Sequence, residues 1–168
     1  MRDETIQRLN AMNVAFYDQT APLFDATRQG PWAGWAQVVP HIPVGRPLRV
    51  LDVGCGNGRF GVWLRGQVDG PLHYHGTDNN ETLLGYARSA LGELEQVTLT
   101  AVDLLRDPLP AGVFDLVVLF GVVHHVPSLA RRERFLADLG AKIAPGGLLA
   151  FAAWRFYDSD RLRARVLP

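Results

Sequence analysis

Glycines at every second position, with one acid ahead of them, are the residues of this chain that most clearly indicate chemistry. Gly54, Gly56 and Gly58 follow the apolar segment 49–53, and Asp52 lies inside that segment. Glycines at this spacing let the backbone turn sharply and bring bare main chain against a ligand. Asp52 would repel a phosphate group but suits a ligand that carries hydroxyl groups or positive charge. The loop therefore predicts a site for an adenosyl ligand without a pyrophosphate, which favours S-adenosylmethionine over a dinucleotide.

Further acids follow the next two predicted strands. Asp78 comes directly after the segment 73–77, and Asp103 lies just past the segment 97–101. Asp78 can accept hydrogen bonds from both ribose hydroxyl groups, and Asp103 can accept one from an adenine amino group. Each acid also has a structural interpretation, Asp78 as a helix cap and Asp103 as the start of a turn. With Asn79 and Leu104 bracketing the adenine, the predicted cofactor-binding residues are Asp52, Gly54, Cys55, Gly56, Gly58, Asp78, Asn79, Asp103, Leu104 and Phe120.

Residues 56–61 also match the G-x-G-x-x-G pattern of dinucleotide-binding loops. In that pattern the first glycine directly follows the strand, whereas Gly54 and Cys55 intervene here. Asp52 would also lie close to the pyrophosphate, with no evident cation to neutralise it. A dehydrogenase is therefore the disfavoured interpretation.

Candidate catalytic residues follow the fourth predicted strand and lie in the N-terminal segment. A carboxylate acceptor is already ionised and needs only a cation to hold it, for which Arg28, Arg131 and Arg155 are suitable by type. A hydroxyl or amine acceptor would need a base, and His124 or His125 could take its proton. Because neighbouring strand residues point to opposite faces, at most one histidine should face the substrate, and a packed structural role stays open. The predicted catalytic residues are His124, His125 and Arg28.

Three other residue sets have both a ligand interpretation and a structural one. His73 and His75 share one strand face, but no third ligand is evident, so no metal site is predicted. Cys55 is expected to be a small packing residue rather than a nucleophile. Trp32 and Trp35 either cover the cofactor, stack on a base or pack on one helix face, and their spacing does not decide between these roles.

Elements that alternate along the chain must position these residues. The apolar periodicity predicts helices over residues 1–21, 32–39, 59–67, 81–91 and 129–143, and strands over residues 49–53, 73–77, 97–101, 114–120 and 148–154. This alternation predicts an α/β fold, a Rossmann-like doubly wound sheet of mainly parallel strands with ligands beyond their carboxyl ends. Residues 1–48 should form an N-terminal helical cap and residues 49–168 the cofactor-binding core, within a single domain overall.

Composition and charge indicate the cellular location and the kinds of partner to expect. The chain has 168 residues, a formal net charge of zero and one cysteine. These values predict a cytoplasmic protein without membrane segments and give no overall attraction to nucleic acid. From Arg131 onward, however, eight basic residues stand against four acidic ones. This excess either faces a polyanion or forms an ordinary solvated helix surface.

Residues 49–156 resemble the class I S-adenosylmethionine-dependent methyltransferases. The shared features are the glycine-rich loop, Asp78, Asp103, the strand that begins Phe114-Asp115-Leu116-Val117 and the turn Ala144-Pro145-Gly146-Gly147. A narrower similarity links residues 17–32, 53–58 and 122–125, the pair Arg131-Arg132 and Trp154 to the tRNA wobble-uridine carboxymethyl methyltransferases, which carry a methyltransferase type 11 domain. This resemblance implies methylation of a carboxylate on a modified tRNA uridine to give a methyl ester, with S-adenosyl-L-methionine as cofactor.

The resemblance also indicates which of the family's elements this chain is expected to lack. Members of the class usually have seven strands, and we expect the last two to be missing here, together with the family's C-terminal substrate elements. The chain is either naturally short or truncated, or a partner covers the incomplete sheet edge. That partner would be a second copy or an activator subunit, since eukaryotic members work with a small zinc-binding one. Three functions stay open: a tRNA methyltransferase, a small-molecule methyltransferase of the same fold, and a non-catalytic binding module.

Overall fold

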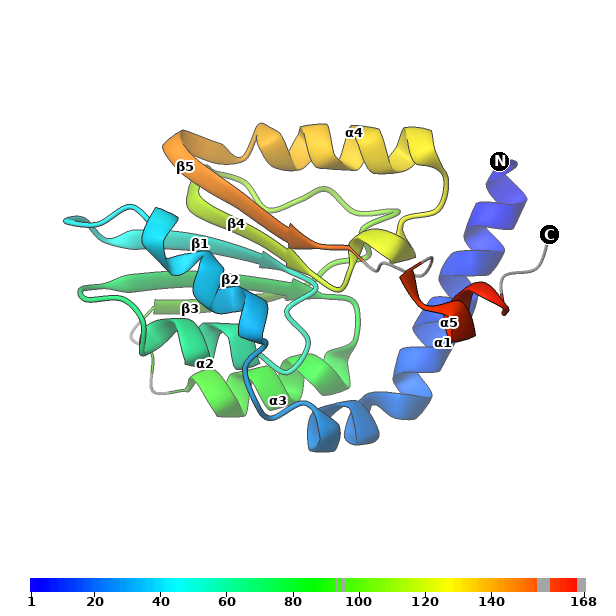
Figure 1. Ribbon diagram of the computed structural model, residues 1–168, viewed down its shortest axis with the longest axis horizontal. Coiled ribbons are helices and arrows are strands. Elements are labelled where there is room, and N and C mark those ends of the chain that lie inside the picture. Colours follow the sequence, from blue (N-terminus) through cyan, green and yellow to red (C-terminus); the bar gives the residue numbers. More distant parts are fainter. Residues whose placement is uncertain (93, 95, 154–157, 166–168) are drawn as a thin grey trace.

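Two largely apolar segments form the centre of a parallel sheet in the computed structural model, which describes residues 1–92, 94, 96–153 and 158–165. Strands β1 and β4 are almost wholly buried, as the central strands of a sheet covered on both faces must be. The sheet order is β3-β2-β1-β4-β5 (Figure 1). The strand bounds are β1 Leu48–Val53, β2 Leu72–Asp78, β3 Gln96–Ala101, β4 Phe114–Phe120 and β5 Ile143–Ala152.

Helices cover both faces of this sheet. Helices α2 (Arg59–Arg65) and α3 (Glu81–Leu91) lie on one face, and α4 (Leu129–Gly140) lies on the other (Figure 1). Alternate strand residues serve the two sides: Val50 packs with the core under α2 and α3, whereas Leu51 packs with the core under α4. The predicted doubly wound α/β fold is therefore confirmed, and the described residues form five strands.

Helix α1 (Asp3–Thr27) lies at the carboxyl end of the sheet, with the short helix α5 (Asp160–Arg163) at the same end of the molecule (Figure 1). The chain order reverses between the neighbouring strands β1 and β4. In such sheets the crevice outside this switch point is where ligands bind. The fold therefore places α1 over the end of the sheet that carries the predicted site residues.

Several element boundaries differ from the sequence-based predictions. Helix α1 continues through Pro22 to Thr27, because the buried Ala21 and the hydrogen bond from Asn57 to Asp25 hold this part of the helix against the body of the protein. The predicted helix over residues 32–39 consists of two short 3-10 helices, η1 (Ala33–Gln37) and η2 (Val39–His41), with Pro40 lacking the N–H that a continuous helix needs.

The C-terminal part differs in two places. Strand β5 begins at Ile143, so the predicted turn over residues 144–147 lies within it, where the pairing with β4 shifts register. Helix α4 accordingly ends at Gly140. Trp154 and Arg155 lie outside the described residues. Among the described residues, no helix has both the length and the apolar character that a membrane crossing requires.

Candidate active site

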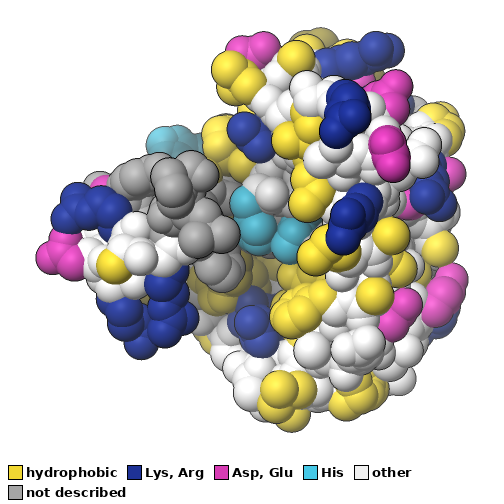
Figure 2. Space-filling model, turned by 90° about the vertical axis from the view of Figure 1, so that its right-hand side faces the viewer, with side chains coloured by type: hydrophobic (Ala, Val, Ile, Leu, Met, Phe, Trp, Pro, Cys, Tyr) yellow, Lys and Arg dark blue, Asp and Glu magenta, His cyan; other side chains and the backbone are white. Residues whose placement is uncertain are grey.

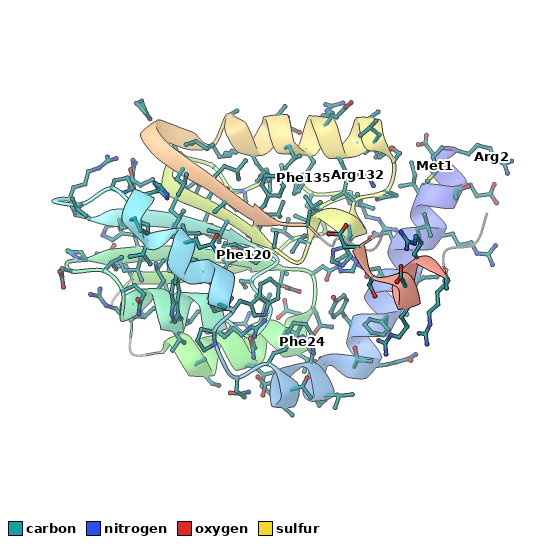
Figure 3. All side chains as sticks on the ribbon, in the orientation of Figure 1. Met1, Arg2, Phe24, Phe120, Arg132 and Phe135 are labelled. Carbon is teal, nitrogen blue, oxygen red and sulfur yellow. The ribbon has the colours of Figure 1, made fainter. Side chains whose placement is uncertain are left out.

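A cavity lies beyond the carboxyl ends of β1, β2, β3 and β4, with α1 along one side. Figure 2 shows this end of the molecule, with histidine side chains in a hollow and basic and hydrophobic side chains around it. Figure 3 labels Phe24 on α1 and Phe120 at the end of β4, which both line the cavity. Of the predicted site residues, those that line it are Arg28, Asp52, Gly54, Cys55, Gly56, Asp78, Asn79, Asp103, Leu104, Phe120, His124 and His125.

The glycine loop is held by the end of β2. The backbone N–H groups of Gly54 and Cys55 both donate to the carbonyl oxygen of Thr77, at 2.7 and 2.8 Å. Gly54 has a φ of +71°, and a Cβ there would lie 2.3 Å from Cγ2 of Val122. Glycine is therefore required at this position both for its backbone conformation and for the close approach of the β4 exit.

Gly58 differs from the other two glycines of the predicted loop, because it does not line the cavity. It is the N-cap residue of α2 with a φ of +77°, and a Cβ there would meet Ala87 and Leu91 of α3 at 3.1 and 2.9 Å. Its place in the sequence motif reflects tight packing between α2 and α3. The structure therefore gives Gly58 a packing role, and the cofactor contact at Gly58 stays a prediction.

Asp78 holds the glycine loop from the end of β2. Its carboxylate accepts hydrogen bonds from the N–H groups of Gly56 and Asn80, both at 2.9 Å. Burial raises the pKa of Asp78, and these backbone hydrogen bonds oppose the shift. The cap of α3 is Asn80, whose Oδ1 accepts from the N–H of Leu83 at 2.9 Å, so Asp78 does not serve as that cap.

Asp103 is held by α1 as well as by its own turn. Its carboxylate accepts a hydrogen bond from Nδ2 of Asn10 at 2.7 Å and another from the N–H of Leu105 at 2.9 Å. The sequence analysis missed Asn10, which is 8% exposed and lines the cavity. A signal was present, because Asn10 lies four residues after the buried Ile6 on the inner side of α1.

The two histidines lie on a 3-10 helix rather than on a strand. Strand β4 ends at Phe120, and the helix η3 covers Val123–His125. The imidazole centroids of His124 and His125 lie 4.0 Å apart, and both residues line the cavity. The expectation that only one of them could face the substrate was therefore wrong, because it assumed strand geometry where the backbone is helical.

Burial makes both imidazoles weak bases. The pKa of His125 is lowered to about 4 by burial and by the neighbouring His124, and burial also lowers the pKa of His124. Nε2 of His125 lies 3.1 Å from the hydroxyl of Tyr17 on α1. At neutral pH this part of the cavity therefore presents neutral imidazoles, which can donate and accept hydrogen bonds but carry no charge.

Arginine lines the cavity near the glycine loop. The guanidinium of Arg28 lies 4.2 Å from the ring centroid of Phe24. Arg59, which the sequence analysis did not select, lies over Trp32 at 5.1 Å and donates to the carbonyl of Gly30 at 2.9 Å. Both arginines line the cavity. Burial lowers the pKa of Arg59, and the nearby charge of Arg28 lowers it further, so an anion close to both guanidinium groups would be favoured.

The other predicted cation, Arg131, pairs with Asp3 of α1 at 3.0 Å and does not line the cavity. Both predicted tryptophans line the cavity. Trp35 is 2% exposed and packs with Phe60, whereas Trp32 is 37% exposed.

Beneath the glycine loop, Asp52 is buried and accepts a hydrogen bond from the hydroxyl of Tyr74 at 2.5 Å. Burial raises the pKa of Asp52 to about 7; the Tyr74 hydrogen bond lowers it and the nearby Asp78 raises it further. Burial also raises the pKa of the Cys55 thiol well above its ordinary value. This agrees with the packing role predicted for Cys55, because a nucleophilic cysteine needs a thiolate.

Of the two histidines on β2, His75 contacts the hydroxyl of Thr100 at 3.0 Å.

A model of the methyltransferase domain matches residues 50–147 of this chain. The chain therefore belongs to the methyltransferase domain family, and the resemblance seen in its sequence is confirmed.

Several relatives have more specific names. The tRNA (carboxymethyluridine(34)-5-O)-methyltransferase of Saccharomyces cerevisiae is 30% identical over 82% of this chain and 46% of its own length. The mouse protein ALKBH8, which carries the same enzyme name, is 28% identical over 82% of this chain and 19% of its own length. A putative methyltransferase of Encephalitozoon cuniculi is 33% identical over 83% of this chain and 60% of its own length. The chain thus spans between a fifth and three fifths of these relatives.

Solved structures of methyltransferases share the fold. An S-adenosylmethionine-bound amino pentose methyltransferase from Micromonospora echinaspora has a TM-score of 0.64 and 28% identity, over 81% of this chain and 58% of that one. A TehB-like S-adenosylmethionine-dependent methyltransferase from Corynebacterium glutamicum has a TM-score of 0.62 and 26% identity, over 92% of this chain and 83% of that one. These similarities confirm the Rossmann-like arrangement.

Proposed function

We propose that this chain transfers a methyl group from S-adenosyl-L-methionine to the carboxylate of a modified wobble uridine in tRNA, giving a methyl ester. The names of the yeast and mouse relatives support this acceptor. The observation that carries the proposal is the composition of the cavity wall. Acids lie at the ends of β2 and β3, and an arginine and two neutral imidazoles complete the wall at α1 and the β4 exit.

The residues present fit the cofactor. The carboxylate of Asp78 suits a pair of ribose hydroxyl groups, and the backbone of Gly54 and Gly56 can approach a ligand closely. Oδ1 of Asn57 also lies buried at the cavity without a hydrogen-bond partner among the described residues, so it can accept from a ligand ammonium group. When bound, S-adenosylmethionine supplies a methyl group on a sulfonium that is its own leaving group.

The protein then has to orient the acceptor and exclude water. A base with a pKa of about 4, as at His125, deprotonates a hydroxyl or ammonium acceptor poorly at neutral pH. A carboxylate acceptor needs no deprotonation. Arg28 can hold it by charge, and the imidazoles of His124 and His125 can donate hydrogen bonds to it. The neutral histidines therefore favour the carboxylate over a hydroxyl or amine.

The proposed acceptor also indicates the partners and the cellular location of this chain. The basic residues of α4 and α5 would face the tRNA, and an activator subunit or second copy at the β5 edge stays the expectation from the sequence. A tRNA acceptor and a single buried cysteine agree with the predicted cytoplasmic location. A small-molecule acceptor is the second candidate, favoured by the likeness to an amino pentose methyltransferase and by the zero net charge.

Cofactor binding is the first test. Titration calorimetry with S-adenosylmethionine should show one site per chain, and Asp78→Ala should abolish it. Asp69→Ala, remote from the cavity on the loop before β2, is the matched control and should bind like the wild type. No binding by the wild type would refute the methyltransferase proposal, and full binding by Asp78→Ala would refute the ribose assignment.

The acceptor needs a separate assay. Radiolabelled methyl donor and bulk tRNA from a strain that lacks the wobble-uridine enzyme should give label in tRNA that mild base removes, as an ester requires. Arg28→Ala should reduce this label while cofactor binding persists. Binding of the cofactor without base-labile label in tRNA would overturn the tRNA acceptor and leave the small-molecule alternative.

A further inference from the structure

A stripe of exposed apolar side chains runs along the outer face of α1. Successive members are three, four and seven residues apart, which keeps them on one side of an α-helix. Contiguous exposed apolar surface of this kind usually marks an interaction site in a soluble domain. The stripe consists of Leu9, Met12, Phe16 and Leu23, which are 42%, 61%, 58% and 64% exposed.

The opposite side of α1 is already committed to the body of the protein. Asn10 donates to Asp103 at 2.7 Å, and Asp25 accepts from Nδ2 of Asn57 at 2.8 Å. Ala21 between them is fully buried. The cavity therefore accounts for the inner side of the helix and not for the outer stripe.

The spacing of the stripe is symmetric about Phe16. Leu9 and Leu23 each lie seven residues from it, at opposite ends of the stripe. If a second α1 packs antiparallel with Phe16 at a two-fold axis, Leu9 lies opposite Leu23 of the partner subunit, and the converse contact forms at the other end. A two-fold interface requires this self-complementary arrangement, in which the same patch serves both subunits.

Charge also favours a second copy as the occupant. Asp18 is the single charged residue between Leu9 and Leu23, and it accepts a hydrogen bond from Nδ2 of Asn80 at 2.8 Å. Pairing two such helices therefore brings no like charges together at the stripe, and their antiparallel dipoles attract. A nucleic acid would instead need basic residues along this face.

We propose that a second copy of this chain packs antiparallel on α1 through the stripe, with Phe16 at the two-fold axis. Tyr17 and Phe24 of the same helix line the cavity, so a contact on the outer face of α1 also fixes the position of this cavity wall. The proposal does not rest on the function proposed above, because assembly is measured without cofactor or acceptor.

Sedimentation equilibrium over a wide range of concentrations tests the interface. The wild type should show a monomer–dimer equilibrium, and Phe16→Glu should remove the dimer because two carboxylates would meet at the axis. Val62→Glu is the matched control, since Val62 is 47% exposed on α2, and it should leave the dimer intact. A wild type that stays monomeric, or a dimer that persists in Phe16→Glu, would overturn the proposal.

Cysteine cross-linking tests the orientation and does not depend on whether Phe16→Glu folds. The natural Cys55 is buried, so it should stay unreactive. With an added oxidant, Phe16→Cys should form a covalent dimer, and Leu9→Cys should do so only when mixed with Leu23→Cys. Efficient self-cross-linking of Leu9→Cys would show a parallel pairing and exclude the two-fold arrangement at Phe16.

Discussion

A single methyl group at Gly54 should cost this protein a large part of its stability. Gly54 has a φ of +71°, and the new Cβ would lie 2.3 Å from Cγ2 of Val122. A left-handed backbone costs a non-glycine residue about 1–2 kcal/mol, and overpacking of a buried contact adds about 1–3 kcal/mol. Gly54→Ala should therefore lower the free energy of unfolding by about 2–5 kcal/mol, against the ~5–15 kcal/mol typical of a domain.

Two other glycines separate these contributions. Gly45 has a φ of +79° with no atom within 4 Å of a built Cβ, so Gly45→Ala should show the backbone cost alone. Gly85 lies in α3 with the same open space and no positive φ, so Gly85→Ala should stabilise the protein by about 0.5–1 kcal/mol. Urea unfolding followed by tryptophan fluorescence measures all three variants on one scale.

A double-mutant cycle identifies the contact itself. Val122→Ala removes the methyl group that a Cβ at Gly54 would strike, although it also destabilises the core in its own right. The double variant should be more stable than the sum of the two single changes predicts, by about 0.5–3 kcal/mol. Strict additivity, or a loss in Gly54→Ala no larger than in Gly45→Ala, would refute the close approach between the glycine loop and the β4 exit.

Three further predictions concern titration and capping. Asp52 keeps its proton in the folded state up to about pH 7, so its burial weakens stability progressively as pH rises from about 4 to 7. Urea unfolding of Asp52→Asn should therefore show a gain over wild type that grows by about 4 kcal/mol across that range and is then constant; a difference independent of pH would contradict it. His125 should stay neutral in the folded protein until the pH falls to about 4, and imidazole NMR signals that titrate near pH 6.5 would remove the argument for a carboxylate acceptor. Asn80→Ala should lower the free energy of unfolding by about 1–2 kcal/mol in the same urea assay, because the N–H of Leu83 loses its cap and Asp18 loses the hydrogen bond from Nδ2; an unchanged midpoint would show that the two hydrogen bonds contribute nothing.

Local patterns in the sequence predicted the sheet and one wall of the cavity. The run Phe114–Phe120 is apolar except for Asp115 because β4 is buried on both faces, and Asp78 and Asp103 lie near strand ends that parallel pairing brings to one edge. The strand boundaries that failed, such as the start of β5 at Ile143, involve a register shift that depends on the neighbouring strand. Such a shift leaves no periodic signal in the strand's own residues.

The contacts of α1 could not be predicted in this way. Asn10 meets Asp103 and Tyr17 meets His125 across 93 and 108 residues of sequence. Periodicity indicates which side of a helix is apolar, but it does not say which distant loop that side will meet. The place of α1 beside the cavity depends on these long-range contacts, and the low pKa of His125 depends on its burial in the folded chain.

The glycine loop shows most clearly which properties the sequence determines and which only the tertiary structure decides. Its sequence alone determined a sharp turn after a buried strand, because the conformational freedom of glycine is a property of the residue itself. The charge of Asp52, by which the sequence analysis disfavoured a pyrophosphate, depends on the fold, because burial raises the pKa of Asp52 to about 7. Only the tertiary structure separated Gly54 and Gly56, which line the cavity, from Gly58, which packs against Ala87 and Leu91. It likewise placed two imidazoles on one short 3-10 helix beside that loop. The physical reason is that a residue's conformation is set locally, whereas what its surface touches is set by the packing of the whole chain.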